Sequence, residues 1–363
     1  MLASIYQSIY LIIVIIITFS VMSSYHVRVN SGITNRGSQN NNVLIITTLF
    51  FIIAIGFRPI SYAFVDMMSY HMDYQYLLGR PFSLSEVGNN YLFDLILPWF
   101  ASNKIPESLY FLLISAIYFG CIAWACKEIF PRDALLAFIV YLGAFSTFTY
   151  GTNGIKAGAA ASIFLLALAY RRNLFLAIFF LLVSLGFHHS MLAPIVAYVI
   201  AYYYRKPKAY LWAWIICLLL AAVHVTVFMS LFAGYTNEHG AEYLTTDPYE
   251  NNVSGFRPDF ILYSAVPIFL GYHFMHKRYV VSDFYKFLWS TYTMTNCGFL
   301  LCTYGSFINR IAYLSWLMYP IVLLYPFINT EWAKHPKTSK RYLKYAVYGH
   351  LAFTAFMTFI YYA

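Results

Sequence analysis

The run LIIVIIITF at residues 11–19 has no charged side chain and lies inside an apolar stretch long enough to cross a lipid bilayer. Such stretches recur along the whole chain of 363 residues, of which 61% are hydrophobic and 10% are charged. A soluble domain carries about 25% charged residues, and a soluble protein of this size could not hide so much apolar surface. The sequence therefore predicts an all-α polytopic membrane protein, built as a single integral membrane domain over residues 1–363.

Twelve segments are long and apolar enough to be predicted as transmembrane helices. They are residues 2–22, 43–60, 108–126, 133–150, 155–170, 173–187, 190–204, 209–233, 259–276, 284–304, 308–329 and 345–362. A further apolar segment at 89–107 contains Asp94, Pro98 and Asn103. Because irregular backbone at membrane depth is tolerated only beside protein or water, we expect this segment to be a re-entrant or surface helix.

The distribution of basic residues predicts the orientation of these spans. With the N-terminus outside, 17 of the 23 Lys and Arg residues fall in inside loops, as the positive-inside rule requires. The net charge of +9 is thus an orientation signal, and no nucleic-acid partner is predicted. The longest external polar stretches are 61–107 and 234–258, whereas 330–344 is a basic cytoplasmic loop. We expect function to lie on the external loops.

Four external cationic residues lie at the mouths of predicted spans: Arg58, Lys156, Arg257 and Arg310. Ionisable groups at membrane depth are costly, so their presence suggests a function. If they converge, they form a pocket for phosphate or pyrophosphate. Each of them could instead extend its charge to the lipid headgroups.

Lys156 follows an Asn-Gly turn in YGTNGIKAG (150–158) and opens a helix of small residues. A helix N-terminus favours an anion, because its backbone N–H groups are unpaired and its dipole end is positive. A plain helix-packing face is the alternative.

The external segment after Arg58 combines acids with tyrosines at helical spacing. Asp66, Tyr70 and Tyr74 follow at i, i+4 and i+8, which predicts an amphipathic surface helix with one acid-and-tyrosine stripe. Tyrosine rings suit apolar sugar faces, and carboxylates accept protons from hydroxyls; a solvated helix face is the alternative. Glu86 and His188 are further candidates for acid–base chemistry near neutral pH.

An ordered set of short motifs resembles the EpsG-like, Wzy-type polysaccharide polymerases. The set comprises GFR at 56–58, Asp66 with Tyr70, Glu86 with Gly88, NGIKAGAA at 153–160, FHHS at 187–190 and Arg310. The resemblance spans roughly residues 56–313. It implies a glycosyltransferase-C-like membrane fold and a polar site containing Arg58, Asp66, Glu86, His188 and Arg310. One position departs from the family pattern, since Lys156 and Ala157 replace Arg and Gln and the bidentate fork of arginine is lost there.

The resemblance implies assembly of O-antigen of lipopolysaccharide, capsule or exopolysaccharide from repeat units carried on undecaprenyl pyrophosphate. We expect a glycosyltransferase in the bacterial inner membrane whose active site faces the periplasm. Arg58, Lys156, Arg257 and Arg310 would hold pyrophosphate, Tyr70 and Tyr74 would bind sugar, and Asp66, Glu86 or His188 would be the base. No cofactor is expected, and no metal is required because fixed cations can replace one.

Three other functions remain open at the level of the sequence. An O-antigen ligase would share the fold and the donor, whereas a lipid-linked oligosaccharide flippase would line both halves of its path with charge. A membrane acyltransferase would need a histidine deep in an early span, which this chain lacks. The expected partners are the undecaprenyl-pyrophosphate-linked oligosaccharide, the lipid bilayer, a chain-length regulator and a flippase.

Overall fold

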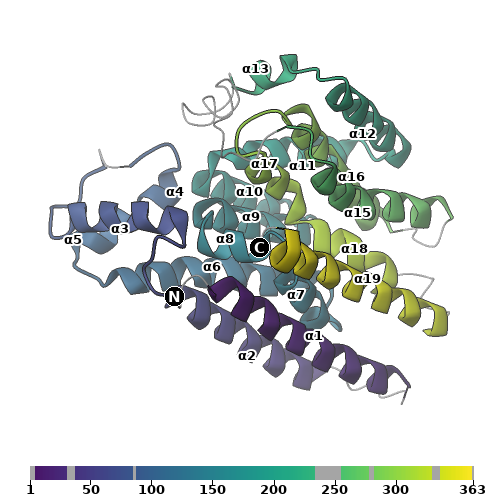
Figure 1. Cartoon of the computed structure of the whole chain (residues 1–363), viewed down its shortest axis with the longest axis horizontal. Helices are drawn as coiled ribbons and strands as arrows, with labels where there is room; N and C mark the ends of the chain where they lie inside the picture. The colour runs from purple at the N-terminus through teal and green to yellow at the C-terminus, as the bar shows by residue number, and fades with distance from the viewer. Residues whose placement is uncertain are drawn as a thin grey trace. The chain divides into compact units, whose positions relative to one another are not determined.

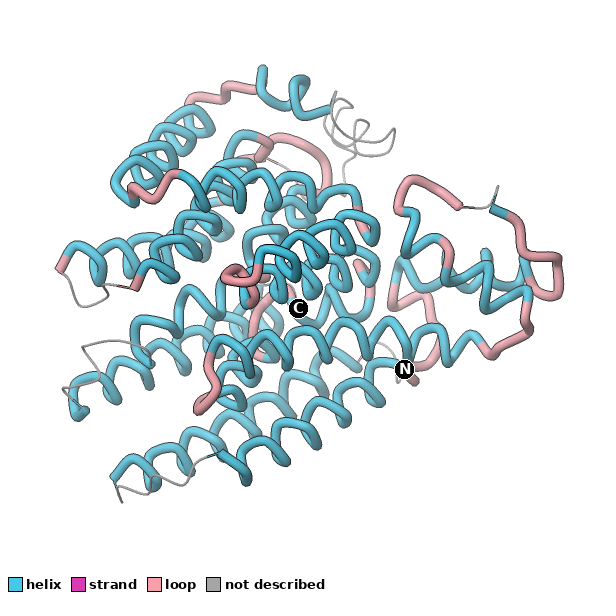
Figure 2. The backbone as a smooth tube through the Cα atoms, turned by 180° about the vertical axis from the view of Figure 1, so that it is seen from behind, coloured by secondary structure: helices cyan, strands magenta, loops and turns pink. Residues whose placement is uncertain are grey.

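Helices make up the regular structure of the chain. The computed structural model describes residues 5–30, 37–84, 87–233, 255–277, 282–328 and 336–361, and in these ranges no strand occurs (Figure 2). The predicted all-α class is therefore confirmed. Glu86 and residues 234–254, most of the stretch 234–258 that was expected to be external, lie outside the described ranges.

Three segments among the described residues are long and apolar enough to cross a membrane. They are Tyr6–Ser24 in α1 (Tyr6–Asn30), all of α6 (Glu107–Ile129), and Ile308–Ile328, which joins α17 (Ile308–Trp316) to α18 (Tyr319–Ile328). Other helices are also apolar but have shorter apolar segments. They include α2 (Gly37–Gly56), α9 (Ile155–Ala169), α10 (Leu174–Phe187), α11 (Leu192–Tyr203) and α12 (Pro207–Ala222). These apolar helices support the prediction of a membrane protein. The count of twelve membrane-spanning helices stays a prediction.

Several predicted spans contain two helices with a short break between them, and one of these, Ile308–Ile328, is still long and apolar enough to cross a membrane. The pairs are α7 (Ala134–Leu142) with α8 (Thr147–Thr152), α12 with α13 (Val227–Ala233), and α17 with α18. The break before α13 contains His224 in a left-handed conformation with φ of 61°. The break before α18 precedes Pro320, which has no N–H to donate to the carbonyl four residues earlier. Mean hydropathy does not register such local backbone breaks.

The described part of the stretch 61–107, which was expected to be external, contains three short α-helices. The predicted acid-and-tyrosine helix is confirmed as α3 (Val65–Leu77), and the irregular segment 89–107 forms α4 (Tyr91–Asp94) and α5 (Ile96–Ser102). The N–H of Gly79 donates to the carbonyl of Ala101 over 3.1 Å, so the end of α3 is tied to α5. The segment 89–107 is thus no continuous span in the structure.

The chain divides into two compact units, and each is described by itself. The first comprises Met1–His188 and Lys340–Ala363. In it α9 packs against both α6 and α10 (Figure 1). A Cβ on Gly158 would lie 2.5 Å from the carbonyl oxygen of Tyr150, so the close approach of α8 and α9 requires a glycine there. The small residues after Lys156 therefore do pack helices closely.

The last helix, α19 (Pro336–Phe356), continues into the short π-helical turn Met357–Tyr361 and belongs mostly to the first unit. Thr354 Oγ1 donates to the carbonyl of Gly143 over 2.8 Å, and His350 Nε2 lies 3.2 Å from the carbonyl of Val140. Both contacts satisfy carbonyls near the end of α7, which the following break leaves without helical partners. The C-terminal helix thereby completes the first unit.

The second unit comprises His189–Ser339 and has α16 (Asp283–Leu301) at its centre. This helix packs against α11, α12, α15 (Pro258–His276), α17 and α18. A buried polar chain links three of these helices: Trp214 Nε1 donates to Asn296 Oδ1 over 2.7 Å, and Asn296 Nδ2 donates to Ser315 Oγ over 3.0 Å. Such bonds satisfy polar groups that lipid could not.

Candidate functional site

Arg58 places a positive charge in the interior of the first unit. It lies two residues after the end of α2, and only 4% of its surface is exposed. Its Nη1 donates to the carbonyl of Ile55 and its Nη2 to the carbonyl of Thr152, both over 2.9 Å. The guanidinium carbon also lies 5.5 Å from the ring centre of Phe64 and 5.1 Å from that of Phe111.

All these partners of Arg58 are neutral. Within the described residues its guanidinium forms no ion pair, and Nε has no hydrogen-bond partner. A buried charge is costly to desolvate unless an opposite charge or strong hydrogen bonds compensate it. The surroundings of Arg58 are therefore suited to receive an anion.

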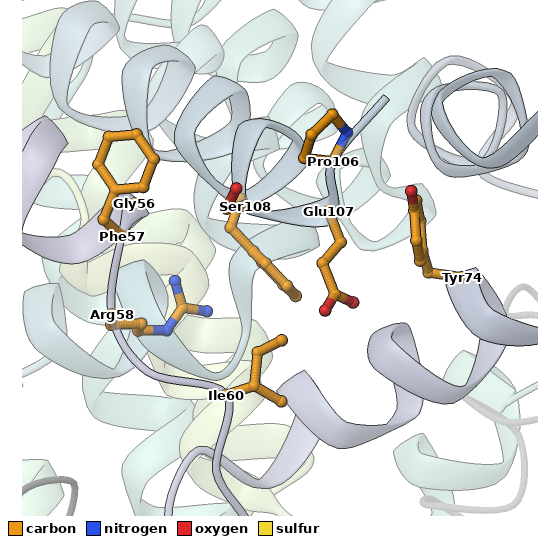
Figure 3. A pocket seen from close by; sticks show the side chains of 9 residues that line it. Gly56, Phe57, Arg58, Ile60, Tyr74, Pro106, Glu107 and Ser108 are labelled. Carbon is orange, nitrogen blue, oxygen red and sulfur yellow. The ribbon is translucent and has the colours of Figure 1, made fainter. Parts of the chain in front are cut away.

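A cavity of about 370 Å³ lies beside this guanidinium. Its walls are formed by the end of α2, by α3 and by the start of α6. They comprise Gly56, Phe57, Arg58, Ile60, Tyr74, Pro106, Glu107, Ser108 and Phe111. Figure 3 shows the guanidinium of Arg58 and the carboxylate of Glu107 directed into this space from different elements. The cavity therefore has a cation and an anion in its walls.

Glu107 is tied to α3 across the cavity wall. Its Oε2 lies 2.8 Å from Nδ1 of His71, and Tyr74 donates its hydroxyl to the carbonyl of Ile105 over 2.6 Å. Burial raises the pKa of Tyr74, and the charge of Glu107 raises that pKa further. Neither Glu107 nor His71 is predicted from the sequence to have a role. The sequence offers one indication for Glu107: it is an acid at the first residue of a long apolar helix, where the helix dipole favours negative charge.

Lys156 lies in the first turn of α9, as predicted, and Gly154 precedes the helix. Its Nζ lies 2.7 Å from Oδ1 of Asp94 and 5.2 Å from the ring centre of Phe93. Asp94 is held in turn, since its Oδ2 accepts the N–H of Asn90 over 3.1 Å. The predicted cation is therefore half of an ion pair whose acidic partner the sequence analysis did not identify.

An aromatic cluster surrounds this ion pair. Tyr70 has its ring centre 5.9 Å from that of Phe93 and 6.2 Å from that of Tyr110, and Phe93 lies 6.1 Å from Phe187. His188 follows Phe187 directly and ends α10, where its N–H donates to the carbonyl of Ser184. The structure thus brings Tyr70, Lys156 and the end of α10 to one aromatic cluster.

The acid-and-tyrosine stripe of α3 faces partly inward. Tyr74 is 5% exposed, whereas Asp66 and Tyr70 are half-buried. Asp73 lies on the same helix; burial raises its pKa, and the charge of Lys156 lowers it. The structure confirms the helix, and a sugar-binding role for Tyr70 and Tyr74 stays a prediction.

Arg257 and Arg310 belong to the second unit. The guanidinium of Arg257 binds both carboxylate oxygens of Asp259, from Nε over 2.9 Å and from Nη2 over 2.5 Å. Arg310 is exposed, with its guanidinium carbon 5.0 Å from the ring centre of Phe307. Since Arg58 and Lys156 lie in the first unit, convergence of all four cations stays a prediction.

No group of His, Cys, Asp and Glu side chains in the described ranges could hold a metal ion. The expectation of a metal-independent reaction remains an expectation.

Comparison with known proteins finds one family. The model of the EpsG family matches residues 41–363. No curated protein and no solved structure matches this sequence.

Proposed function

Since the chain belongs to the EpsG family, we propose that it is a membrane polysaccharide polymerase. It would transfer a growing glycan from undecaprenyl pyrophosphate to a hydroxyl of the next lipid-linked repeat unit. The product would be O-antigen, capsule or exopolysaccharide. The reaction would take place on the periplasmic side of the bacterial inner membrane, beside a flippase and a chain-length regulator.

The observation that carries this proposal is the buried guanidinium of Arg58 beside a cavity of about 370 Å³. Pyrophosphate is already a good leaving group, and its departure needs positive charge more than it needs covalent chemistry. A planar guanidinium suits phosphate oxygens, and with carbonyls and rings as its neutral partners its charge is still available for an anion. Fixed cations of this kind can do the work of a metal ion.

Lys156 is the second cation proposed for the first unit. It is bonded to Asp94 in the structure, so an arriving phosphate would share or displace that carboxylate. Arg257 and Arg310 are the other two residues that we propose to bind pyrophosphate. Tyr70 and Tyr74 would contact sugar, and Asp66, Glu86 or His188 would act in proton transfer.

The glycan profile of a deletion strain tests the proposed activity. We expect the surface glycan to shrink to a single repeat unit on its acceptor, because attachment continues while elongation stops. Re-expression of the chain should restore the long polymer. Loss of all attached glycan would contradict the proposal, since that outcome indicates a ligase or a flippase.

Cysteine labelling tests the proposed orientation, which follows from the 17 of 23 basic residues assigned to inside loops. In a variant whose five native cysteines are replaced, an impermeant reagent added outside should label cysteines introduced at 240–250. It should not label those introduced at 337–341 until the membrane is permeabilised. The opposite labelling pattern would contradict an outward-facing site.

A further inference from the structure

The cavity beside Arg58 has an acid–base feature that the proposed function leaves unused. Glu107 and Arg58 carry opposite charges into one space and form no ion pair with each other in the described structure. The guanidinium of Arg58 is buried without an opposite charge bonded to it in the described ranges, which is costly, whereas the partly exposed carboxylate of Glu107 is bonded to His71. The gap between them is therefore suited to a ligand that contacts both, anionic toward Arg58 and hydroxyl-bearing toward Glu107.

The carboxylate of Glu107 is held in one orientation. Its Oε2 is bonded to His71, and an ionised carboxylate only accepts, so Nδ1 of His71 must carry the proton in that bond. Glu107 is also the first residue of the 23-residue helix α6, where the backbone dipole stabilises a negative charge. Because His71 contacts only Oε2, the other carboxylate oxygen stays available for a substrate.

We infer that Glu107 is the base that accepts the proton of the acceptor hydroxyl, and that His71 is its positioning residue. This inference rests on the proposed function. The hydroxyl oxygen of the incoming repeat unit forms a bond to the anomeric carbon of the growing glycan as its proton passes to Glu107. The bond from that carbon to the pyrophosphate oxygen breaks, and its electron pair leaves with the lipid pyrophosphate. The guanidinium of Arg58 faces the charge that appears there, and the proton later returns from Glu107 to solvent.

Position in the structure favours Glu107 over Asp66 and His188, the two expected bases that lie within the described residues. Neither Asp66 nor His188 lines the cavity at Arg58, whereas Glu107 does. A base must lie within hydrogen-bond reach of the proton that it removes, and the reacting carbon must lie near the cation that receives the leaving group. Glu107 and Arg58 line the same cavity, so one can accept the proton while the other stabilises the leaving group.

The test uses membranes that contain the full chain, supplied with lipid-linked repeat unit extracted from the deletion strain. Glu107→Gln keeps the size of the side chain and removes the proton-accepting charge. We expect kcat for elongation to fall about 100-fold, with KM little changed, because general bases contribute at least this much. Glu128→Gln is the matched control: this exposed glutamate lies near the other end of α6, and its replacement should leave the rate unchanged.

Two further variants separate the chemical role from a structural one. Glu107→Asp keeps the charge but withdraws it by one methylene, so we expect a rate between those of wild type and Glu107→Gln. His71→Gln can still donate to Glu107 and should retain most activity, whereas His71→Leu should lose about tenfold in kcat. Thermal melting of each purified variant reports whether it folds.

The outcomes distinguish a failure of the role inferred for Glu107 from a failure of the proposed polymerase function. If the wild-type chain elongates the substrate and Glu107→Gln elongates it equally fast, Glu107 is not the base. If Glu107→Gln does not fold, Glu107→Asp decides: a wild-type rate with the shortened side chain overturns the inference. If the wild-type chain does not elongate the substrate, the proposed function fails and the inference fails with it.

Discussion

Arg58→Ala is expected to abolish polymer formation, with a loss of at least about 100-fold in elongation rate. Removal of one preorganised group that stabilises developing charge costs about 100- to 1,000-fold in well-studied enzymes. Arg58 is 4% exposed and its hydrogen-bond and ring partners are neutral, so none of these partners can supply the lost charge. The measurement is the length distribution of polymer made by the deletion strain that carries the variant.

The controls for this variant come from the same loop region. Arg80→Ala removes an exposed arginine whose guanidinium carbon lies 3.7 Å from the ring centre of Tyr76, and it should leave the polymer unchanged. Arg58→Lys keeps the charge but loses the planar fork that donates to the carbonyls of Ile55 and Thr152, so a partial loss is expected. Normal polymer from Arg58→Ala, at matched protein levels, would show that Arg58 has only a structural role.

Lys156→Met is expected to lower elongation about 100-fold, whereas Lys156→Arg should retain a substantial share. If the side chain contacts pyrophosphate as a charge, arginine keeps the charge and the reach while methionine keeps only the stem. If the position serves only helix packing, methionine would be tolerated and the bulkier arginine would be the worse variant. The two explanations therefore rank the same two variants in opposite order, and the same polymer assay measures that rank.

A loss of activity in Lys156→Met could also come from lost stability, because Lys156 forms an ion pair with Asp94. A second substitution at Asp94 controls for this effect. Lys156→Met leaves the carboxylate of Asp94 without its partner at 15% side-chain exposure, which costs about 1–3 kcal/mol of stability. The double variant Lys156→Met with Asp94→Asn removes that penalty and should melt near the wild-type temperature. We expect it to remain inactive. Recovery of activity in the double variant would assign the loss to stability and remove Lys156 from the site.

Local sequence patterns predicted many of the helices, because the start of a helix and its apolar character depend on residues that are close together in the sequence. Hydropathy identified the helical membrane class, and the spacing of Asp66, Tyr70 and Tyr74 predicted α3. The Asn-Gly turn predicted that α9 begins just before Lys156. Hydropathy did not predict the local backbone breaks inside apolar runs, such as those at His224 and before Pro320.

The sequence by itself determined that cations lie at the ends of apolar helices, because charge and hydropathy are properties of each segment. Only the tertiary structure decided which groups they meet. Arg58 bonds to Thr152, which is 94 positions away, Lys156 to Asp94 across 62 positions, and His71 to Glu107 across 36. Side-chain charge acts over a few ångströms, and packing alone determines which distant residues come that close. In the sequence Asp94 is evidence against a span, and Glu107 has no predicted role. Packing makes Asp94 the partner of Lys156 and places Glu107 in the cavity beside Arg58.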